Sequence, residues 1–316
     1  MTDDRLPVGW TVGLLDQVTT GAPSLPSRVV LYASEKSGKT SFGCFAPKPI
    51  FLMTSGETGL LSLIESGQVP ATPHFPSDFR SFSDLENAVA ALGREEHSYR
   101  TLVLDTGNGA ELMLQAEVTE RHFGGDVEKF GEYGRGMASC VPRWAAFLRL
   151  IDDVRLKRGM SVLFLHHAKV KSTQNPTGKD WDQYRPEALD KLWALTHKWA
   201  DVIAYYGIRV TVSRDDKATG ETRYMRCAPS AAVVAGNRYG MPDEITASPG
   251  AANLWKAFAG ALVKAKAKAR DAVKAAEPAP ALVAPAVPVP LPQTDPTEYA
   301  DDGDPLNDLP ANGGAS

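Results

Sequence analysis

The stretch Arg28-Val-Val-Leu-Tyr-Ala-Ser-Glu-Lys-Ser-Gly-Lys-Thr-Ser41 decides the fold of this chain. Its apolar start predicts a buried strand, and a helical pattern begins near Gly38. The loop between them fits the phosphate-binding pattern G-x-x-x-x-G-K-[ST], except that Ala33 stands at the first position. Backbone N–H groups of such a loop, together with the helix N-terminus, attract an anion. The stretch therefore predicts a strand, a phosphate-binding loop and a helix in succession.

Each polar residue of the predicted loop has an expected role. Lys39 can reach the β- and γ-phosphates of ATP, and the hydroxyl of Thr40 can ligate Mg²⁺. Gly38 lets the backbone approach the phosphate closely, whereas Ala33 restricts the loop if its position needs a positive φ. A chance Gly-Lys-Thr in a surface turn is the alternative. The residues expected to bind the nucleotide are Ser34, Glu35, Lys36, Ser37, Gly38, Lys39, Thr40 and Ser41.

An acidic partner for this loop follows another apolar run, Thr101-Leu-Val-Leu-Asp105. Asp105 is expected at the end of a buried strand, the Walker B arrangement, where it would hold Mg²⁺ through a water. The alternative is an aspartate that caps the following turn, since Asp favours such positions. Together the two elements predict a Mg²⁺-dependent P-loop ATPase, and therefore an enzyme with ATP as its substrate.

Two further side chains are candidates for the hydrolysis step, which needs a group that positions or activates water. Glu57 follows the second predicted strand, and the alternative is that it caps the next helix. Glu111 is the second choice, although we expect it on the exposed face of a helix. His167 ends the fourth predicted strand and is expected to sense the γ-phosphate. His166 then points to the opposite face, and a core role is the alternative for either histidine.

The rest of the folded region, residues 8–250, alternates short apolar runs with helical patterns, which predicts an α/β fold with a mainly parallel sheet flanked by helices. The strands are expected at residues 28–32, 50–53, 101–104, 161–165 and 202–206. The helices are expected at residues 40–45, 60–65, 85–92, 110–121 and 144–156. Residues 209–213 and 222–227 predict an antiparallel hairpin at the sheet edge. Pro142 predicts that the last helix begins or kinks there.

Three segments differ in composition. Residues 1–250 form the predicted ATPase domain, and residues 251–276 predict a basic Ala/Lys-rich helix. Residues 277–316 contain seven acidic and no basic residues, are rich in Pro and Ala, and predict a disordered acidic tail. The tail would act as a solubilising segment, imitate single-stranded DNA, or recruit a partner such as a single-strand-binding protein.

Composition excludes several classes of protein. The formal net charge of −4 argues against a globally basic nucleic-acid binder, although a local basic patch is compatible with it. The three cysteines are far apart, which favours reduced core thiols over disulfides or a zinc site. The N-terminus does not resemble a signal peptide, and no apolar run is long enough for a membrane span. We therefore expect a cytoplasmic protein, in the host cytoplasm if a phage encodes it, without a membrane partner.

Residues 25–245 resemble the phage and prophage RecA-like nucleotide-binding ATPases, which are related to RadA and RecA and include Sak-type single-strand annealing recombinases. The stretches that carry the resemblance are Lys36-Ser-Gly-Lys-Thr40, Thr101-Leu-Val-Leu-Asp-Thr106, Phe130-Gly-Glu-Tyr-Gly-Arg-Gly136, Arg158-Gly-Met-Ser-Val-Leu-Phe-Leu-His-His-Ala-Lys-Val170 and Asn237-Arg-Tyr-Gly-Met-Pro242. The resemblance implies a RecA-like P-loop core that assembles into homo-oligomers with ATP at the subunit interface. It also implies that Arg238 acts in trans as an arginine finger. The alternative is a surface arginine stacked on Tyr239.

Two basic, aromatic loops are expected to bind single-stranded DNA, by analogy with RecA-like proteins. Residues 122–136 carry Lys129 and Arg135. The other loop, residues 169–186, combines cations with aromatic side chains, a pairing that suits phosphates and splayed bases. Its expected DNA-binding residues are Lys169, Lys171, Lys179, Trp181, Tyr184 and Arg185. The alternative is a mobile loop that orders over the nucleotide or a neighbouring subunit.

These features together predict an ATPase that acts in DNA recombination or single-strand annealing. A helicase loader or protein-remodelling ATPase, stimulated by a protein partner, is one alternative. A nucleotide-dependent structural switch with weak hydrolysis is another.

Overall fold

The computed structural model describes residue 18 and residues 24–212, 215 and 218–275. The predicted acidic tail lies outside these residues. The strands are β1 (Arg28–Ala33), β2 (Pro49–Met53), β3 (Thr101–Asp105), β4 (Ser161–Thr173), β5 (Trp181–Pro186), β6 (Val202–Val212), β7 (Ala218–Arg226), β8 (Gly236–Asn237) and β9 (Glu244–Thr246). The helices are α1 (Lys39–Cys44), α2 (Gly59–Glu65), α3 (Phe82–Arg94), α4 (Gly107–Phe123), α5 (Val127–Gly131), the 3-10 helix η2 (Glu132–Gly134), α6 (Arg135–Arg158), α7 (Asp190–Trp199) and α8 (Ala251–Ala275).

The strands form one mixed sheet in the order β2-β3-β4-β1-β6-β7-β9, with β5 paired to β4 and β8 paired to β6. The pairs β2–β3, β3–β4, β4–β1 and β1–β6 are parallel. β6 and β7 form the antiparallel hairpin that the sequence predicts. The expected α/β fold, with a mainly parallel sheet and an antiparallel edge, is therefore confirmed. The phosphate-binding strand β1 lies inside the sheet, between β4 and β6.

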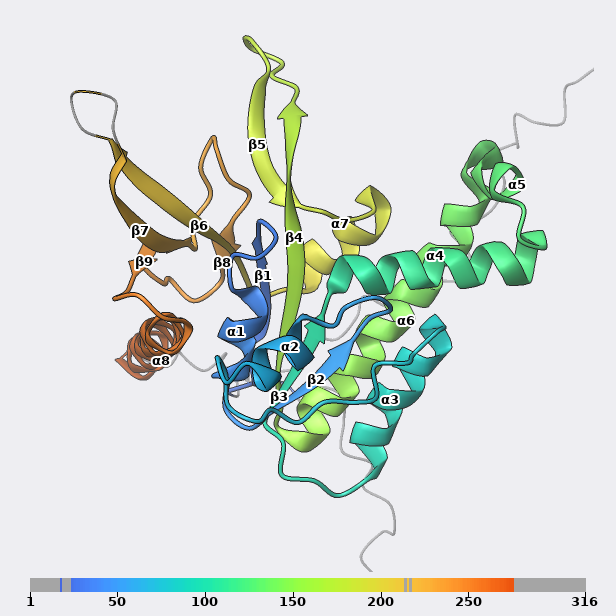
Figure 1. The fold of residues 1–316 in the computed structure, drawn as a ribbon, viewed down its shortest axis with the longest axis horizontal. Coiled ribbons are helices and arrows are strands. Elements are labelled where there is room, and N and C mark those ends of the chain that lie inside the picture. The colour runs from blue at the N-terminus through green and yellow to red at the C-terminus, as the bar shows by residue number, and fades with distance from the viewer. Residues whose placement is uncertain (1–17, 19–23, 213–214, 216–217, 276–316) are drawn as a thin grey trace, which may run out of the picture. The chain divides into compact units, whose positions relative to one another are not determined.

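Helices cover both faces of the sheet, and alternate side chains of each strand point to different cores (Figure 1). On one face, Val30 and Tyr32 of β1 pack in a core that includes residues of α3, α4, α6 and α7. On the other face, Val29 and Leu31 share a core with α1, α2 and α8. This double burial explains why the parallel strands read as continuous apolar runs.

The basic helix α8 is part of the second core through its first half. Leu254 and Phe258 are buried, and the rings of Trp255 and Phe258 contact the ring of Phe42 on α1. Aromatic pairs of this kind add to the stabilisation from area burial. The end of β9 and the start of α8 are thereby fixed beside the phosphate-binding loop.

The expectation that the helix begins at Pro142 is wrong. α6 begins at Arg135, after Gly134 in a left-handed conformation, and continues through Pro142 to Arg158. Its buried side chains Cys140, Trp144 and Phe147 lie on both sides of the proline, so packing compensates for the hydrogen bond that Pro142 cannot donate.

The two loops expected to bind DNA also differ from expectation. Residues 169–186 form a hairpin, because β4 continues to Thr173 and pairs antiparallel with β5. Residues 122–136 are mostly helical, from the end of α4 through α5 and η2 to the start of α6. Figure 1 shows α5 at the far end of α4, well away from the β4–β5 hairpin.

Candidate nucleotide-binding site

The phosphate-binding loop connects the carboxyl end of β1 to the first turn of α1. Gly38 has a φ of 103°, a conformation that glycine adopts without strain. The hydroxyl of Ser37 donates a hydrogen bond to the Ser34 carbonyl oxygen at 2.7 Å, which closes the loop. Ala33 is the last residue of β1 and has no positive φ, so alanine at this position imposes no strain.

Lys39 lies almost entirely inside the protein, with 5% of its surface exposed. Its ammonium group donates hydrogen bonds to the carbonyl oxygens of Ala33 and Ser34, at 3.0 and 2.8 Å. Burial lowers the pKa of this ammonium, and the nearby carboxylates of Asp105 and Glu57 counteract the shift. The lysine is thus held at the loop as a point charge, directly where a phosphate would be bound.

Thr40 and Asp105 meet across the carboxyl ends of the strands. The Thr40 hydroxyl donates a hydrogen bond to Asp105 Oδ2 at 2.7 Å. Asp105 is 4% exposed, and burial raises the pKa of its carboxyl to about 6, although the Thr40 hydrogen bond opposes this shift. A hydroxyl and a carboxylate oxygen at this separation are hard ligands, of the kind that Mg²⁺ shares with substrate phosphates.

His167 joins the lysine to a carboxylate. The strand register places His167 opposite Ala33, at the start of the loop. Lys39 Nζ lies 3.3 Å from His167 Nδ1, and His167 Nε2 lies 3.4 Å from Glu57 Oε1. Because an ammonium can only donate, Nδ1 accepts and the Nε2–H group donates to Glu57. This hydrogen bond is the main cause that lowers the pKa of Glu57, so that Glu57 is held as a carboxylate.

The neighbouring His166 points to the opposite face of the sheet. It is fully buried, and its Nδ1 lies 3.2 Å from the Glu187 carbonyl oxygen. Burial lowers the pKa of this imidazole to about 4, so it remains neutral in the core. Only one histidine of the pair therefore faces the loop, as alternation along a strand requires.

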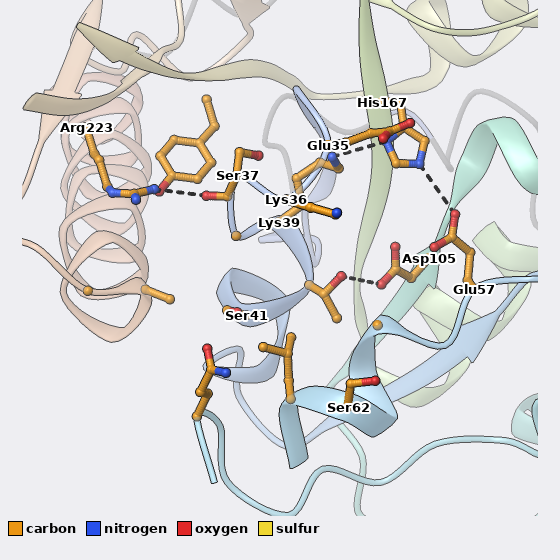
Figure 2. Close-up of a pocket in the computed structure, with 18 of the residues that line it drawn as sticks. Glu35, Lys36, Ser37, Lys39, Ser41, Glu57, Ser62, Asp105, His167 and Arg223 are labelled. Carbon is orange, nitrogen blue, oxygen red and sulfur yellow. Dashed lines mark hydrogen bonds and ion pairs between the residues drawn. The ribbon is translucent and has the colours of Figure 1, made fainter. Parts of the chain in front are cut away.

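These groups surround a cavity of about 790 Å³, large enough for a nucleotide (Figure 2). Every residue from Glu35 to Ser41 lines it, together with Glu57, Asp105 and His167. Ser34 is not in the wall but contributes its carbonyl oxygen to Lys39. The remaining lining residues are Gly59, Ser62, Leu63, Gln68, Tyr206, Arg223, Pro249, Gly250 and Ala251.

Sequence reasoning missed the wall that β6, β7 and the start of α8 provide. Arg223 Nη1 donates hydrogen bonds to the Ser37 carbonyl oxygen at 3.0 Å and to the Tyr206 hydroxyl at 2.9 Å. No local motif marks these residues, because Arg223 follows Ser37 by 186 positions in the chain. The antiparallel pairing of β6 and β7 brings them to the loop.

The structure places Arg238 at the other end of the sheet. Its guanidinium lies 3.3 Å from Asp201 and donates to the Lys198 carbonyl oxygen. Asp201 precedes β6 and binds Arg28 at the amino end of β1, so Arg238 is remote from the loop of its own chain. To act in trans as an arginine finger, Arg238 would have to leave Asp201 and contact the nucleotide of a neighbouring subunit.

Glu111, expected on an exposed helix face, is instead fully buried. One carboxylate oxygen accepts a hydrogen bond from the Leu189 backbone N–H at 2.6 Å, and the other has no partner among the described residues. Burial raises the pKa of this carboxyl to about 8. The first turns of α4 lie beneath the segment that follows β5, and that segment covers the side chain.

Several of the expected DNA-binding side chains have partners within the β4–β5 hairpin and its surroundings. Lys171 forms an ion pair with Asp190 at 2.8 Å, and Lys169 donates to the Ala188 carbonyl oxygen at 3.2 Å. The Trp181 indole donates to the Ala231 carbonyl oxygen at 2.7 Å. Tyr184 stacks on Tyr205, with ring centroids 5.0 Å apart.

The hairpin has further cations. Arg185 donates to the side chains of Gln183 and Thr173. Lys179 lies in the exposed turn between the strands, and its ammonium has no partner among the residues that the structure describes. The hairpin is therefore a solvated basic arm that carries Tyr184 along β5 and Trp181 next to its turn.

The other region expected to bind DNA has its cations in local ion pairs. Lys129 pairs with Asp126 at 3.1 Å, and Arg135 pairs with Glu132 at 3.2 Å. Tyr133 between them is 95% exposed. These residues lie neither at the cavity nor on the β4–β5 hairpin.

A family model described as an AAA domain matches residues 25–239, which is more than half of the chain. The chain therefore belongs to this family of AAA-type P-loop ATPase domains, whose nucleotide-binding loop is the one described above. No curated protein matches the chain. The narrower likeness to Sak-type recombinases stays a prediction.

The described residues contain no cluster of three or more His, Cys, Asp or Glu side chains that could hold a metal ion. Within the same parts of the chain, none of the helices has the length and apolar character to cross a membrane. All three cysteines are free and buried, as the sequence predicts.

Proposed function

We propose that the protein binds Mg²⁺-ATP in this cavity, hydrolyses it, and couples hydrolysis to single-stranded DNA through the β4–β5 hairpin. One observation carries the proposal. The strand β4 is continuous from His167, which contacts Lys39, to Thr173 in the hairpin. A change at the phosphate end of the cavity can therefore reach the hairpin along one hydrogen-bonded strand.

Hydrolysis would use the groups at the acidic end of the cavity. A water oxygen attacks the terminal phosphorus of ATP, and the bond from that phosphorus to the bridging oxygen of ADP breaks. Glu57, held as a carboxylate by His167, accepts the proton of the attacking water. Lys39 and the loop N–H groups stabilise negative charge on the phosphates.

Mg²⁺ fits the donor set at the same end. Thr40 and Asp105 would hold the ion, with the phosphate oxygens of the nucleotide as its other ligands. When bound, it would neutralise charge on the phosphate chain. Asp105 would have to be ionised for this role, which the pKa of about 6 permits at neutral pH.

A role in recombination or annealing rests on the basic hairpin and on the resemblance of the chain to phage RecA-like ATPases. The phosphates of a single strand would replace the present partners of the lysines. The bases of the strand would stack on Trp181 or Tyr184. The side chains of Lys171, Trp181 and Tyr184 are half-exposed, so this change of partners needs little rearrangement.

A protein partner, as for a helicase loader or remodelling ATPase, is the second candidate. The observation in its favour is that Lys169, Lys171 and Trp181 already have partners within the chain. A surface whose donors already have partners within the chain attracts DNA less strongly.

The test is the rate of ATP hydrolysis with and without single-stranded DNA, at low and moderate salt, with Lys39→Ala as the blank. Stimulation by DNA that fades as salt rises is the expected result, because released counterions drive such binding. A rate above the blank that does not respond to DNA would point to a protein partner. A wild-type rate equal to the blank would contradict hydrolysis itself and favour a nucleotide-dependent switch.

A further inference from the structure

Arg223 is the cation of the cavity that no phosphate-loop motif explains. It comes from β7 and lines the cavity beside Ser37, as Figure 2 shows. Its Nη1 group bridges the Ser37 carbonyl oxygen and the Tyr206 hydroxyl. Within the described parts of the chain, its Nε and Nη2 groups have no hydrogen-bond partner. The guanidinium is thus fixed on one side and has donors left on the other.

The cavity has two chemically different ends, with the phosphate-binding loop between them (Figure 2). Asp105, Glu57 and His167 form one end, where the metal and the terminal phosphate of a bound nucleotide are expected. Arg223 lies at the other side of the loop. A phosphate chain cradled by the loop therefore extends away from the carboxylates and toward the arginine.

We propose that Arg223 binds the α-phosphate of the nucleotide from within the same chain, while Tyr206 positions its guanidinium. This inference rests on the proposed nucleotide-binding function and adds a specific contact to it. It also accounts for the geometry of the arginine: a planar guanidinium whose Nη1 group is bound to two protein oxygens can direct its Nε and Nη2 donors to phosphate oxygens.

The chemistry of the neighbouring wall supports this placement. The cavity wall also includes Pro249, Gly250 and Ala251 at the start of α8, and Leu63 and Gln68 on the α2 side. These residues carry no charged side chain, which suits a ribose and base and not a further phosphate.

The experiment compares Arg223→Ala with Arg226→Ala in equilibrium binding of ADP and of pyrophosphate. Arg226 is on the same strand, but its side chain contacts Ala228 and Asp243 and does not line the cavity. Pyrophosphate has no α-phosphate or nucleoside, and it is expected to occupy the loop beside Lys39. The same variants are also compared in kcat and KM for ATP and in thermal midpoint.

We expect Arg223→Ala to weaken ADP binding by about 10- to 100-fold, the range for loss of a hydrogen bond to a charged group. Pyrophosphate binding should change by less than about 2-fold, and the loss for ATP should appear in KM with kcat kept within about 3-fold. Arg226→Ala should bind ADP like the wild type. Arg223→Lys, which keeps the charge but loses the fork, should be intermediate.

Three results would overturn the inference. Unchanged ADP affinity would remove Arg223 from the nucleotide. An equal loss for ADP and pyrophosphate would mean that Arg223 acts by shaping the loop through Ser37. A fall in kcat with KM unchanged would assign it to the terminal phosphate. If the wild type bound neither ADP nor pyrophosphate, the proposed nucleotide-binding function itself would fail, which these variants distinguish from failure of the arginine alone.

Discussion

The nucleotide cavity and the β4–β5 hairpin both carry charged side chains, but the two regions hold them in different ways. In the cavity, Lys39 and Asp105 are almost fully buried, and they contact His167 of β4 and Thr40 of α1. On the hairpin, Lys171 and its partner Asp190 are exposed to solvent. Exposed ion pairs contribute little to stability and exchange readily, whereas a buried charge that loses its partner is strongly disfavoured. The cavity is therefore a preformed site, and the hairpin is a surface whose charges can change partners.

Removal of the carboxylate of Glu57 should have the largest effect. We expect Glu57→Gln to lower the rate of ATP hydrolysis by about 100- to 10,000-fold, the usual contribution of a general base. Nucleotide binding should persist, because Lys39 and the loop remain. Steady-state hydrolysis and equilibrium binding of ATP measure the two effects. Glu65→Gln, at the exposed end of α2, is the matched control. A variant that kept the wild-type rate would exclude Glu57 as the base.

Glu111 of α4 tests the same contrast between buried and exposed charges. Its carboxylate accepts a hydrogen bond from the Leu189 backbone N–H, in the segment that follows the β4–β5 hairpin. Its folded pKa of about 8 lies above its ordinary value of 4.5, so burial favours the protonated form. This contribution to stability is complete below about pH 4.5 and is lost as the pH rises through about 8. Each unit of such a shift corresponds to about 1.4 kcal/mol.

We therefore expect Glu111→Gln to be more stable than the wild type at pH 8.5 by a larger margin than at pH 5. Urea denaturation at both pH values measures the difference. Glu120→Gln, on the exposed face of the same helix, is the matched control. Equal differences at the two pH values would mean that Glu111 does not titrate in this range.

Lys179 and Lys171 lie on the same hairpin, but only Lys171 has an ion-pair partner among the residues that the structure describes. If single-stranded DNA binds there, Lys179→Ala should weaken binding by roughly 5-fold and lower the salt dependence by about one phosphate contact. Lys171→Ala should have a smaller effect, because Asp190 already neutralises part of the charge of Lys171. Binding titrations at several salt concentrations measure both, and a larger effect of Lys171→Ala would reverse this order.

The smallest expected effect is a gain. Asp190→Asn should release Lys171 and increase affinity for single-stranded DNA by about 2-fold, since an exposed pair is worth less than about 1 kcal/mol. Fluorescence anisotropy of a labelled strand would detect the change. The double variant with Lys171→Ala is the control and should show no gain. A gain in the double variant would place the effect elsewhere than on Lys171.

Local sequence was informative where one short segment contains a complete structural motif. Residues 28–41 predicted a strand, loop and helix, and the structure has all three in that order. Asp105 and His167 could be placed because each follows an apolar run, and parallel strands bring their carboxyl ends to one edge of a sheet. The same regularity explains why the α/β fold was predictable.

Local sequence was misleading for residues 122–136 and 169–186. Glycine and charge in these segments predicted loops, but packing at α6 and pairing of β4 with β5 formed helix and hairpin instead. Glu111 was misplaced for a related reason. A helical carboxylate looks solvent-facing until another part of the chain covers it, and here residues near Leu189 do so.

The sequence by itself determined the fold class, the phosphate-binding loop and the edge of the sheet at which the site lies. These follow from hydrophobic periodicity and from backbone geometry within a few residues. Only the tertiary structure decided that Arg223 and Tyr206 complete the cavity, that Arg238 pairs with Asp201, and that Lys171 pairs with Asp190. Such contacts join residues distant along the chain, so they depend on how the strands pair and not on any local pattern.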